Sequence, residues 1–122
     1  MNFSSRERSS AVIFDLQTTS LRELNTALHA PDLSGEFVIE NSAGAHNVAV
    51  GLNAPVTVTI DGHVGYYAAG MNQHANVIIN GNAGTGVAEN MMSGCVWVKG
   101  NASQSAGATA HGGLLVVEGD AA

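Results

Sequence analysis

Short apolar runs alternate with Gly, Asn and Ala from Phe37 to the end of the chain, and helical periodicity is missing there. One five-residue motif occurs four times in this region. The copies are Ile60-Asp61-Gly62-His63-Val64, Ile79-Asn80-Gly81-Asn82-Ala83, Val98-Lys99-Gly100-Asn101-Ala102 and Val117-Glu118-Gly119-Asp120-Ala121. Their glycines are each 19 residues apart. This period is too short for a pair of helices and is typical of one coil of a parallel β-helix, in which each strand pairs with the equivalent strand of the next coil.

Aligning the chain at this period predicts which side chains face inward. The apolar columns are Ile39, Val58, Val77, Val96, Leu115; Ile60, Ile79, Val98, Val117; and Ala45, Val64, Ala83, Ala102, Ala121. Because side chains alternate along a strand, the positions between the strand columns face outward. The same alignment places Gly51 in the column of Gly70 and Glu89.

One outward column becomes apolar toward the C-terminus, and we call its members Ile78, Trp97 and Val116 the outer stripe. An apolar surface with a Trp on the outside of a fold is usually covered by another part of the chain or by a partner protein. Two interpretations are open. The stripe is an interface for a partner, or the N-terminal helix covers it through Leu21, Leu24 and Leu28.

The segment before the repeats has a different pattern. Residues 1–10 are polar and are predicted to be a flexible arm. Residues 11–36 are predicted to form an N-terminal cap, with a strand over 11–16 and a helix over 18–30, and residues 37–122 form the repeats. Ser20 and Glu23 have the spacing of a capping box at the start of the helix, and Pro31 ends it. The fold class is therefore all-β, a parallel β-helix with 19-residue coils preceded by a short strand and one helix.

Composition removes several classes of protein. Charged residues make up only 11% of the chain, which argues against a bundle of amphipathic helices. With four Lys and Arg and a net charge of −6, no basic surface for nucleic acid can form. No apolar run reaches membrane length and no signal peptide is evident, so we expect a cytoplasmic protein. The single cysteine, Cys95, cannot form an internal disulfide or hold an iron–sulfur cluster alone.

The glycine-rich stretch Ile79–Gly94 suggests a phosphate-binding loop at first sight. Gly81, Gly84 and Gly86 do not have the G-x-G-x-x-G spacing, and neither a helix nor a G-K-[ST] motif follows. Every repeat has its own glycine turn, so we interpret Gly62, Gly81, Gly100 and Gly119 as structural glycines that adopt a conformation other residues resist.

The remaining polar residues form no convincing catalytic group. His74 and His111 could share a corner of the solenoid, although a whole coil separates them. Glu89 stands where the two preceding repeats have glycine. It is interpreted either as a solvated carboxylate in a turn or as part of a site on the solenoid face. We expect no catalytic, cofactor-binding or metal-binding residues in this chain. The alternatives are a ligand-binding or enzymatic site near Glu89, His74 and His111, and a self-assembling β-helix.

The repeats resemble a known family. The segment VTIDGHVGYYAAGMNQHANVIINGNAGTGVAENMMSGCVWVKGNASQSAGATAHGGLLVVEGDAA (residues 58–122) is similar to the G-x-G-x-G repeat family. That family includes the C-terminal domain of the glutamate synthase large subunit, one of the subunits of formylmethanofuran dehydrogenase and the middle subunit of N-methylglutamate synthase. FDLQTTSLRELNTALHA (residues 14–30) resembles the strand and helix that precede the family's repeats, and the whole looks most similar to the stand-alone subunits near N-methylglutamate synthase.

The resemblance implies a right-handed parallel β-helix that is not itself catalytic. Such a scaffold holds a glutamine amidotransferase subunit against a flavin synthase subunit that carries FMN and iron–sulfur clusters, and ammonia passes between their two sites. In N-methylglutamate synthase the acceptor amine is methylamine. This chain is shorter than other members, so we expect either that a partner or a second copy covers the open last coil, or that the chain is a shortened form or a piece.

Overall fold

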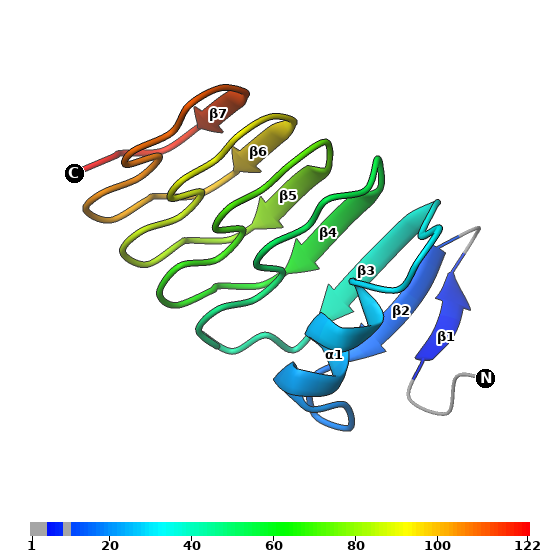
Figure 1. The fold of residues 1–122 in the computed structure, drawn as a ribbon. Coiled ribbons are helices and arrows are strands. Elements are labelled where there is room, and N and C mark those ends of the chain that lie inside the picture. Colours follow the sequence, from blue (N-terminus) through cyan, green and yellow to red (C-terminus); the bar gives the residue numbers. More distant parts are fainter. Residues whose placement is uncertain (1–4, 9–10) are drawn as a thin grey trace.

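A single seven-stranded sheet runs the length of the molecule. The structure is a computed structural model and describes residues 5–8 and 11–122. The strands are β1 (Ser5–Arg8), β2 (Ala11–Asp15), β3 (Glu36–Glu40), β4 (Thr57–Asp61), β5 (Asn76–Asn80), β6 (Cys95–Val98) and β7 (Leu114–Val117), and they lie in sequence order (Figure 1). Pairing is parallel from β2 to β7. The predicted parallel β-solenoid is confirmed.

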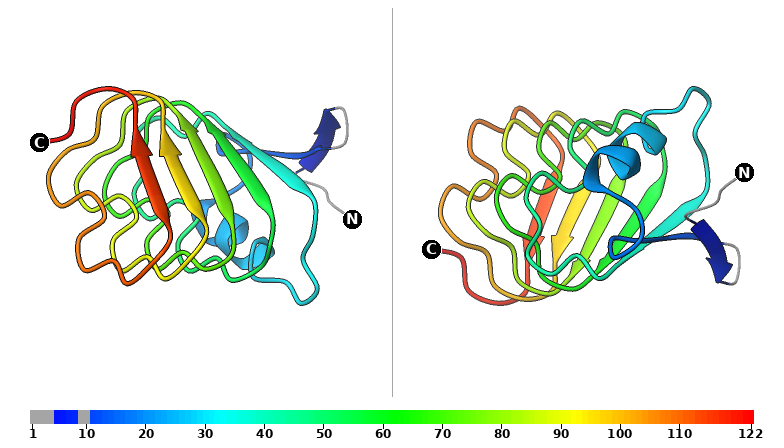
Figure 2. Two further views of the ribbon diagram at one scale, coloured as in Figure 1. Left: turned by 90° about the horizontal axis from the view of Figure 1, so that it is seen from above. Right: turned by 90° about the horizontal axis from the view of Figure 1, so that it is seen from below.

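Each coil contributes one strand, and the rest of the coil returns through stacked turns (Figure 2). Isolated parallel β-bridges also join successive turns, between Val64 and Ala83, Ala83 and Ala102, and Ala102 and Ala121. These residues belong to the predicted inward column of Ala and Val. The interior is largely apolar. Its strand columns are Phe37, Val58, Val77, Val96, Leu115 and Ile39, Ile60, Ile79, Val98, Val117.

The alignment of the first full coil differs from the prediction. Ile39 pairs with Ile60, 21 residues later, and Phe37 occupies the column of Val58 that we expected Ile39 to occupy. From β4 onward the strands pair at 19 residues. The coil after β3 is therefore two residues longer than those that follow, and counting back by 19 was wrong at this point.

In the turns of this coil, paired residues are 20 apart, which is one residue more than in later coils rather than two. Ala69 N–H donates to Val48 O, whereas one coil later Ala88 N–H donates to Ala68 O. Val48 therefore lies opposite Ala68, a separation of 20, and Ala68 lies opposite Val87, a separation of 19. The two extra residues fall in separate places, one in residues 41–43 and the other in residues 53–55.

The turn backbone follows a repeated pattern of left-handed residues. In two successive coils, φ is positive at alternate positions: Tyr67, Ala69, Met71 and then Gly86, Ala88, Asn90. The residues between them, Ala68 and Val87, are buried in the core. This ribbon is not a β-strand, so period-two alternation does not describe which of its side chains face outward.

The helix α1 (Leu21–Ala27) lies beside the first coils and caps their interior (Figure 2). The predicted capping box is present, because Glu23 N–H donates to Ser20 Oγ and Ser20 N–H donates to Glu23 Oε1. Leu24 and Leu28 are fully buried in the central core. The helix is shorter than the predicted span of 18–30 because Leu28 is already its C-cap.

The polar arm is partly structured. Residues 5–8 form β1, which pairs antiparallel with β2, while residues 1–4 and 9–10 lie outside the described residues. On the outer face, a small second cluster of buried residues contains Ala11, Ile13 and Val38. None of the helices in the described part of the chain is long and apolar enough to cross a membrane.

Candidate functional site

The outer stripe lies on the outward face of the sheet, on three successive strands. Ile78 pairs with Trp97, and Trp97 pairs with Val116. All three side chains are half-buried. Trp97 has polar partners within the chain: its Nε1 donates to Glu118 Oε2 at 2.8 Å, and Lys99 Nζ lies 4.2 Å from the ring centroid. Its role as an interface stays a prediction.

The suggestion that the N-terminal helix covers this stripe is wrong. Leu24 and Leu28 pack in the interior, and Leu21 is packed against the same core. Asn25 fixes the helix to the next coil, since Asn25 Nδ2 donates to Asn47 O at 2.9 Å and Ala49 N–H donates to Asn25 Oδ1 at 3.1 Å. The helix is held on the turns, and Trp97 lies on β6.

Of the four repeated glycines, Gly62 has the left-handed conformation that we predicted, whereas the other three are required for a different reason. Gly62 has φ +137°, but Gly81, Gly100 and Gly119 do not have positive φ. A Cβ atom at Gly81 would lie 2.6 Å from Gly62 O, and one at Gly100 would lie 2.7 Å from Gly81 O. These distances are shorter than a van der Waals contact. Glycine is required at these two positions by close stacking of the backbone of successive coils.

The other glycines of the Ile79–Gly94 stretch are explained by packing as well. A Cβ atom at Gly84 would lie 2.8 Å from Gly65 O, and one at Gly86 would lie 2.5 Å from Tyr67 Cδ1. Gly86 therefore leaves room for the ring of Tyr67. This supports the structural interpretation of the glycine-rich stretch over a phosphate loop.

Glu89 shares a column with Gly70, as the sequence predicted, but the prediction that Gly51 belongs to the same column is wrong. Gly51 N–H donates to Gly70 O in the same way as Met71 N–H donates to Glu89 O, so Gly51 lies opposite Met71 rather than Gly70. The column of Glu89 is Val50, Gly70, Glu89 and Ala108. Only one glycine, Gly70, therefore precedes Glu89 in the column. The side chains of Val50 and Glu89 flank Gly70 in the coils before and after it.

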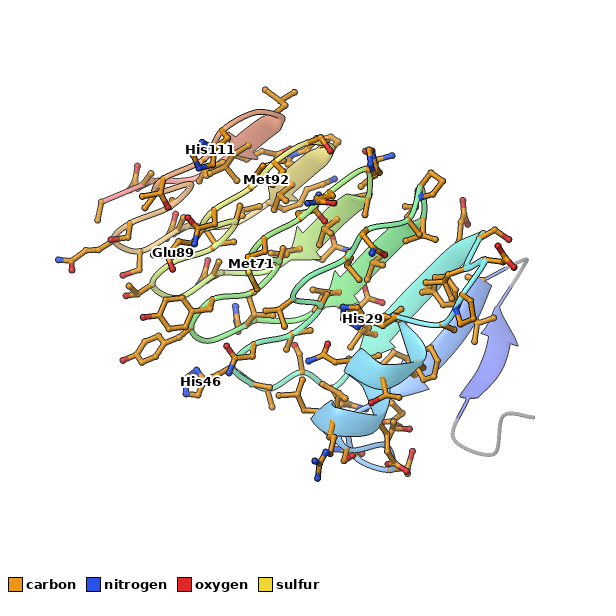
Figure 3. All side chains as sticks on the ribbon, in the orientation of Figure 1. His29, His46, Met71, Glu89, Met92 and His111 are labelled. Atoms are coloured by element: carbon orange, nitrogen blue, oxygen red, sulfur yellow. The ribbon has the colours of Figure 1, made fainter. Side chains whose placement is uncertain are left out.

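A hollow of about 280 Å³ lies at this point of the turns. We call it the Gly70 hollow. Its lining residues are Asn47, Val50, Tyr67, Gly70, Met71, Glu89 and Asn90. Met71 and Glu89 project from neighbouring coils on this face (Figure 3). Within the described residues, the Glu89 carboxylate has neither a hydrogen bond nor an ion pair.

The most exposed large apolar side chains are mostly near this hollow. Tyr66 is 53% exposed, Tyr67 45%, Met71 55% and Met92 45%. His46 stacks on Tyr66 with ring centroids 4.6 Å apart, and Tyr66 contacts Tyr67 edge-on at 6.2 Å. We call Tyr66, Tyr67, Met71 and Met92 the turn-face patch. Sequence reasoning missed it, although an adjacent tyrosine pair in a chain with 5% aromatic residues was a signal that could have found it.

The two candidate histidines, His74 and His111, form hydrogen bonds through their backbone N–H groups. His74 N–H donates to Ser93 Oγ, and His111 N–H donates to Met91 O. No three His, Cys, Asp or Glu of the described residues are grouped so that they could hold a metal ion. Cys95 is a half-buried free thiol.

A buried polar residue, Asn72, was also missed. It occupies the interior column between Leu52 and Met91 and is fully buried. Its Nδ2 donates to Ala75 O at 2.9 Å and to Ser93 O at 3.0 Å, while its Oδ1 has no hydrogen-bond partner in the described part of the chain. Asn72 therefore ties two consecutive turns together from inside the core.

A partial match relates the chain to a known protein. The chain is 55% identical over 62 residues to Protein GlxC of Rhizobium meliloti (strain 1021). The match spans 47% of this chain and 26% of GlxC. No family model matches the chain, and no solved structure matches it.

Proposed function

We propose that this chain is a non-catalytic β-solenoid scaffold in a glutamate-synthase-like complex. It would hold a glutamine amidotransferase subunit against a synthase subunit that carries FMN and iron–sulfur clusters. Among such complexes we favour N-methylglutamate synthase, because the repeats resemble its middle subunit most. The partial match to GlxC spans 47% of this chain and 26% of GlxC, so the choice of complex rests on the resemblance of the repeats.

The observation that carries the proposal is the glycine stack at 62, 81, 100 and 119. In each coil from Gly81 onward a Cβ atom would lie within 2.7 Å of the preceding glycine's carbonyl oxygen, so glycines at 19-residue spacing favour this stack of coils directly. A rigid stack of coils gives an extended surface, and solenoids commonly use such surfaces for binding. The outer stripe and the turn-face patch lie on different sides of the coils, which suits a scaffold with two partners.

Co-expression tests the proposal. The full chain would carry an affinity tag and be produced with the amidotransferase and flavin synthase subunits of an N-methylglutamate synthase. Native mass spectrometry is expected to find all three proteins in one complex, with flavin only in the synthase subunit. Recovery of the chain alone, or only as a homo-oligomer, would contradict the scaffold role and favour self-assembly.

A second measurement addresses a site on the chain itself. The purified chain alone is expected to show no flavin absorbance, no bound metal and no glutaminase activity. A coloured or metal-bearing preparation, or ammonia release from glutamine, would favour the alternative of an enzymatic or ligand-binding solenoid.

A further inference from the structure

Gly70 differs from the other fourteen glycines of the chain. Each of those either has a positive φ or would place a Cβ atom within 3.0 Å of another group. Gly70 has no positive φ, and its Cβ would come no closer than 3.3 Å to Tyr67 O and 3.8 Å to Val50 Cγ1. Neither backbone conformation nor close stacking demands glycine here. What the missing side chain does is leave the Gly70 hollow open between Val50 and Glu89.

One wall of the hollow, the Tyr67 ring, is held in place before anything binds. The ring of Tyr67 lies over Gly86, where any side chain would collide with it, and its edge contacts Tyr66. Tyr66 is in turn stacked on His46, whose Nδ1 accepts a hydrogen bond from Tyr66 N–H at 2.8 Å. A preformed wall lowers the entropy cost of binding, because little has to be ordered when the ligand arrives.

The chemistry of the lining selects a particular kind of group. Val50, Tyr67 and Met71 provide an apolar surface, and Glu89 provides a carboxylate to which no described residue donates. A side chain with an apolar stem and a cationic head matches both features. An arginine fits best, because its planar guanidinium stacks on an aromatic ring and pairs with a carboxylate through two parallel hydrogen bonds. A net charge of −6 on this chain also attracts a basic partner.

We propose that the Gly70 hollow receives an arginine side chain of a partner protein, with the guanidinium between the Tyr67 ring and the Glu89 carboxylate. The surrounding turn-face patch then forms the rest of the contact. The identity of that partner as a subunit of the complex rests on the proposed function, whereas recognition of the arginine side chain does not.

The direct test is an amide NMR titration of the full chain with N-acetyl-arginine N-methylamide, which mimics an arginine within a protein. We expect saturable shifts confined to the amides of Gly70, Met71, Glu89 and Asn90, with millimolar affinity. Glu89→Gln should weaken binding about tenfold, the effect of losing one charge-assisted hydrogen bond. The matched control probe is N-acetyl-norleucine N-methylamide, which keeps an apolar stem without the cation and should bind more weakly than the arginine derivative.

Three results would overturn the proposal: shifts that are not localised, equal binding by wild type and Glu89→Gln, or tighter binding of free methylammonium than of the arginine derivative. The last outcome would indicate a site for a small amine instead of a docking site. Gly70→Leu, which fills the hollow, should also abolish the shifts. If that variant fails to fold, Glu89→Gln still decides.

An assembly experiment separates this inference from the proposed function. In the co-expressed complex, Glu89→Gln should lower the affinity of one partner subunit about tenfold. If no complex forms but the arginine derivative binds at the hollow, the proposed function fails and the hollow stands as an arginine site. If the complex forms and Glu89→Gln leaves its affinity unchanged, the scaffold stands and the docking role of the hollow is wrong.

Discussion

The side-chain oxygen of Asn82 accepts a hydrogen bond from the backbone N–H of Asn101, one coil later, at 2.8 Å. The same position forms the same bond on both sides of this pair. Asn82 N–H donates to His63 Nδ1 at 2.8 Å, and Asp120 N–H donates to Asn101 Oδ1 at 2.9 Å. The residue after each stacked glycine therefore links its coil to the next, and an acceptor atom is all that the position requires.

This relationship predicts the effect of changing Asn82. Asn82→Ala leaves the Asn101 N–H without its acceptor at an exposed site where water can replace it, so the free energy of unfolding should fall by about 1 kcal/mol. Asn82→Asp keeps an acceptor oxygen, so its free energy of unfolding should fall by less. Urea denaturation followed by circular dichroism measures both variants. Equal losses for Ala and Asp would show that the hydrogen bond is not the cause.

A pair of glycine substitutions tests why glycine is present. Gly81→Ala places a methyl group 2.6 Å from Gly62 O and should destabilise the chain by roughly 2 kcal/mol, because two coils would have to separate. Gly70→Ala meets nothing closer than 3.3 Å, a contact with Tyr67 O that a shift of a few tenths of an ångström relieves, so stability should change by less than about 1 kcal/mol. Thermal unfolding of the two variants side by side gives the comparison. Similar destabilisation by both would remove the distinction made for Gly70.

The helix cap makes a separate prediction. Leu28 is 1% exposed within the core, so Leu28→Ala should cost about 2–5 kcal/mol by leaving a cavity beneath α1. Thr26→Ala, on the exposed side of the same helix, is the control and should change stability by less than about 0.5 kcal/mol. Chemical denaturation measures both, and a small effect of Leu28→Ala would mean that the cap is dispensable.

Trp97 distinguishes an interface from internal packing. Trp97→Ala should weaken binding of a partner subunit, or self-association, by more than it lowers stability, because the side chain lies on the outer face of the sheet and not in the core. Trp97→Phe, which loses the bond to Glu118 but keeps an aromatic ring near Lys99, should retain most of the binding. Light scattering and thermal unfolding report the two quantities. Unchanged complex mass and solubility in Trp97→Ala would remove the outer stripe as an interface.

The period of the glycines was enough to predict the solenoid, because close stacking of backbone requires glycine at one fixed position of each coil. It was not enough to place Ile39. A shift of two residues along a strand keeps every side chain on the same face, so Phe37 and Ile39 fit the inward pattern equally well. Pattern alone therefore cannot detect a coil that is two residues longer.

The Gly70 hollow could not be predicted for a related reason. It depends on which residue stands beside Gly70 in its column, and the one-residue offset in the turns replaces Gly51 with Val50. Among the left-handed residues of the turns, Tyr67 and Met71 are exposed but Ala69 between them is buried, so no simple periodicity indicates which ones face outward. By contrast, the Ser20 and Glu23 capping box was predictable because its two bonds are local in sequence.

The extra residue between β3 and the turns has a practical consequence. Asn41 and Ala43 are exposed and have positive φ, and the added length is not passed on, since later strands pair at the regular spacing. The solenoid already contains, at residues 41–43, a position where the chain has grown without disturbing its neighbours. A short peptide tag or a fluorescent label inserted there would report on assembly of the complex while leaving both candidate contact surfaces untouched.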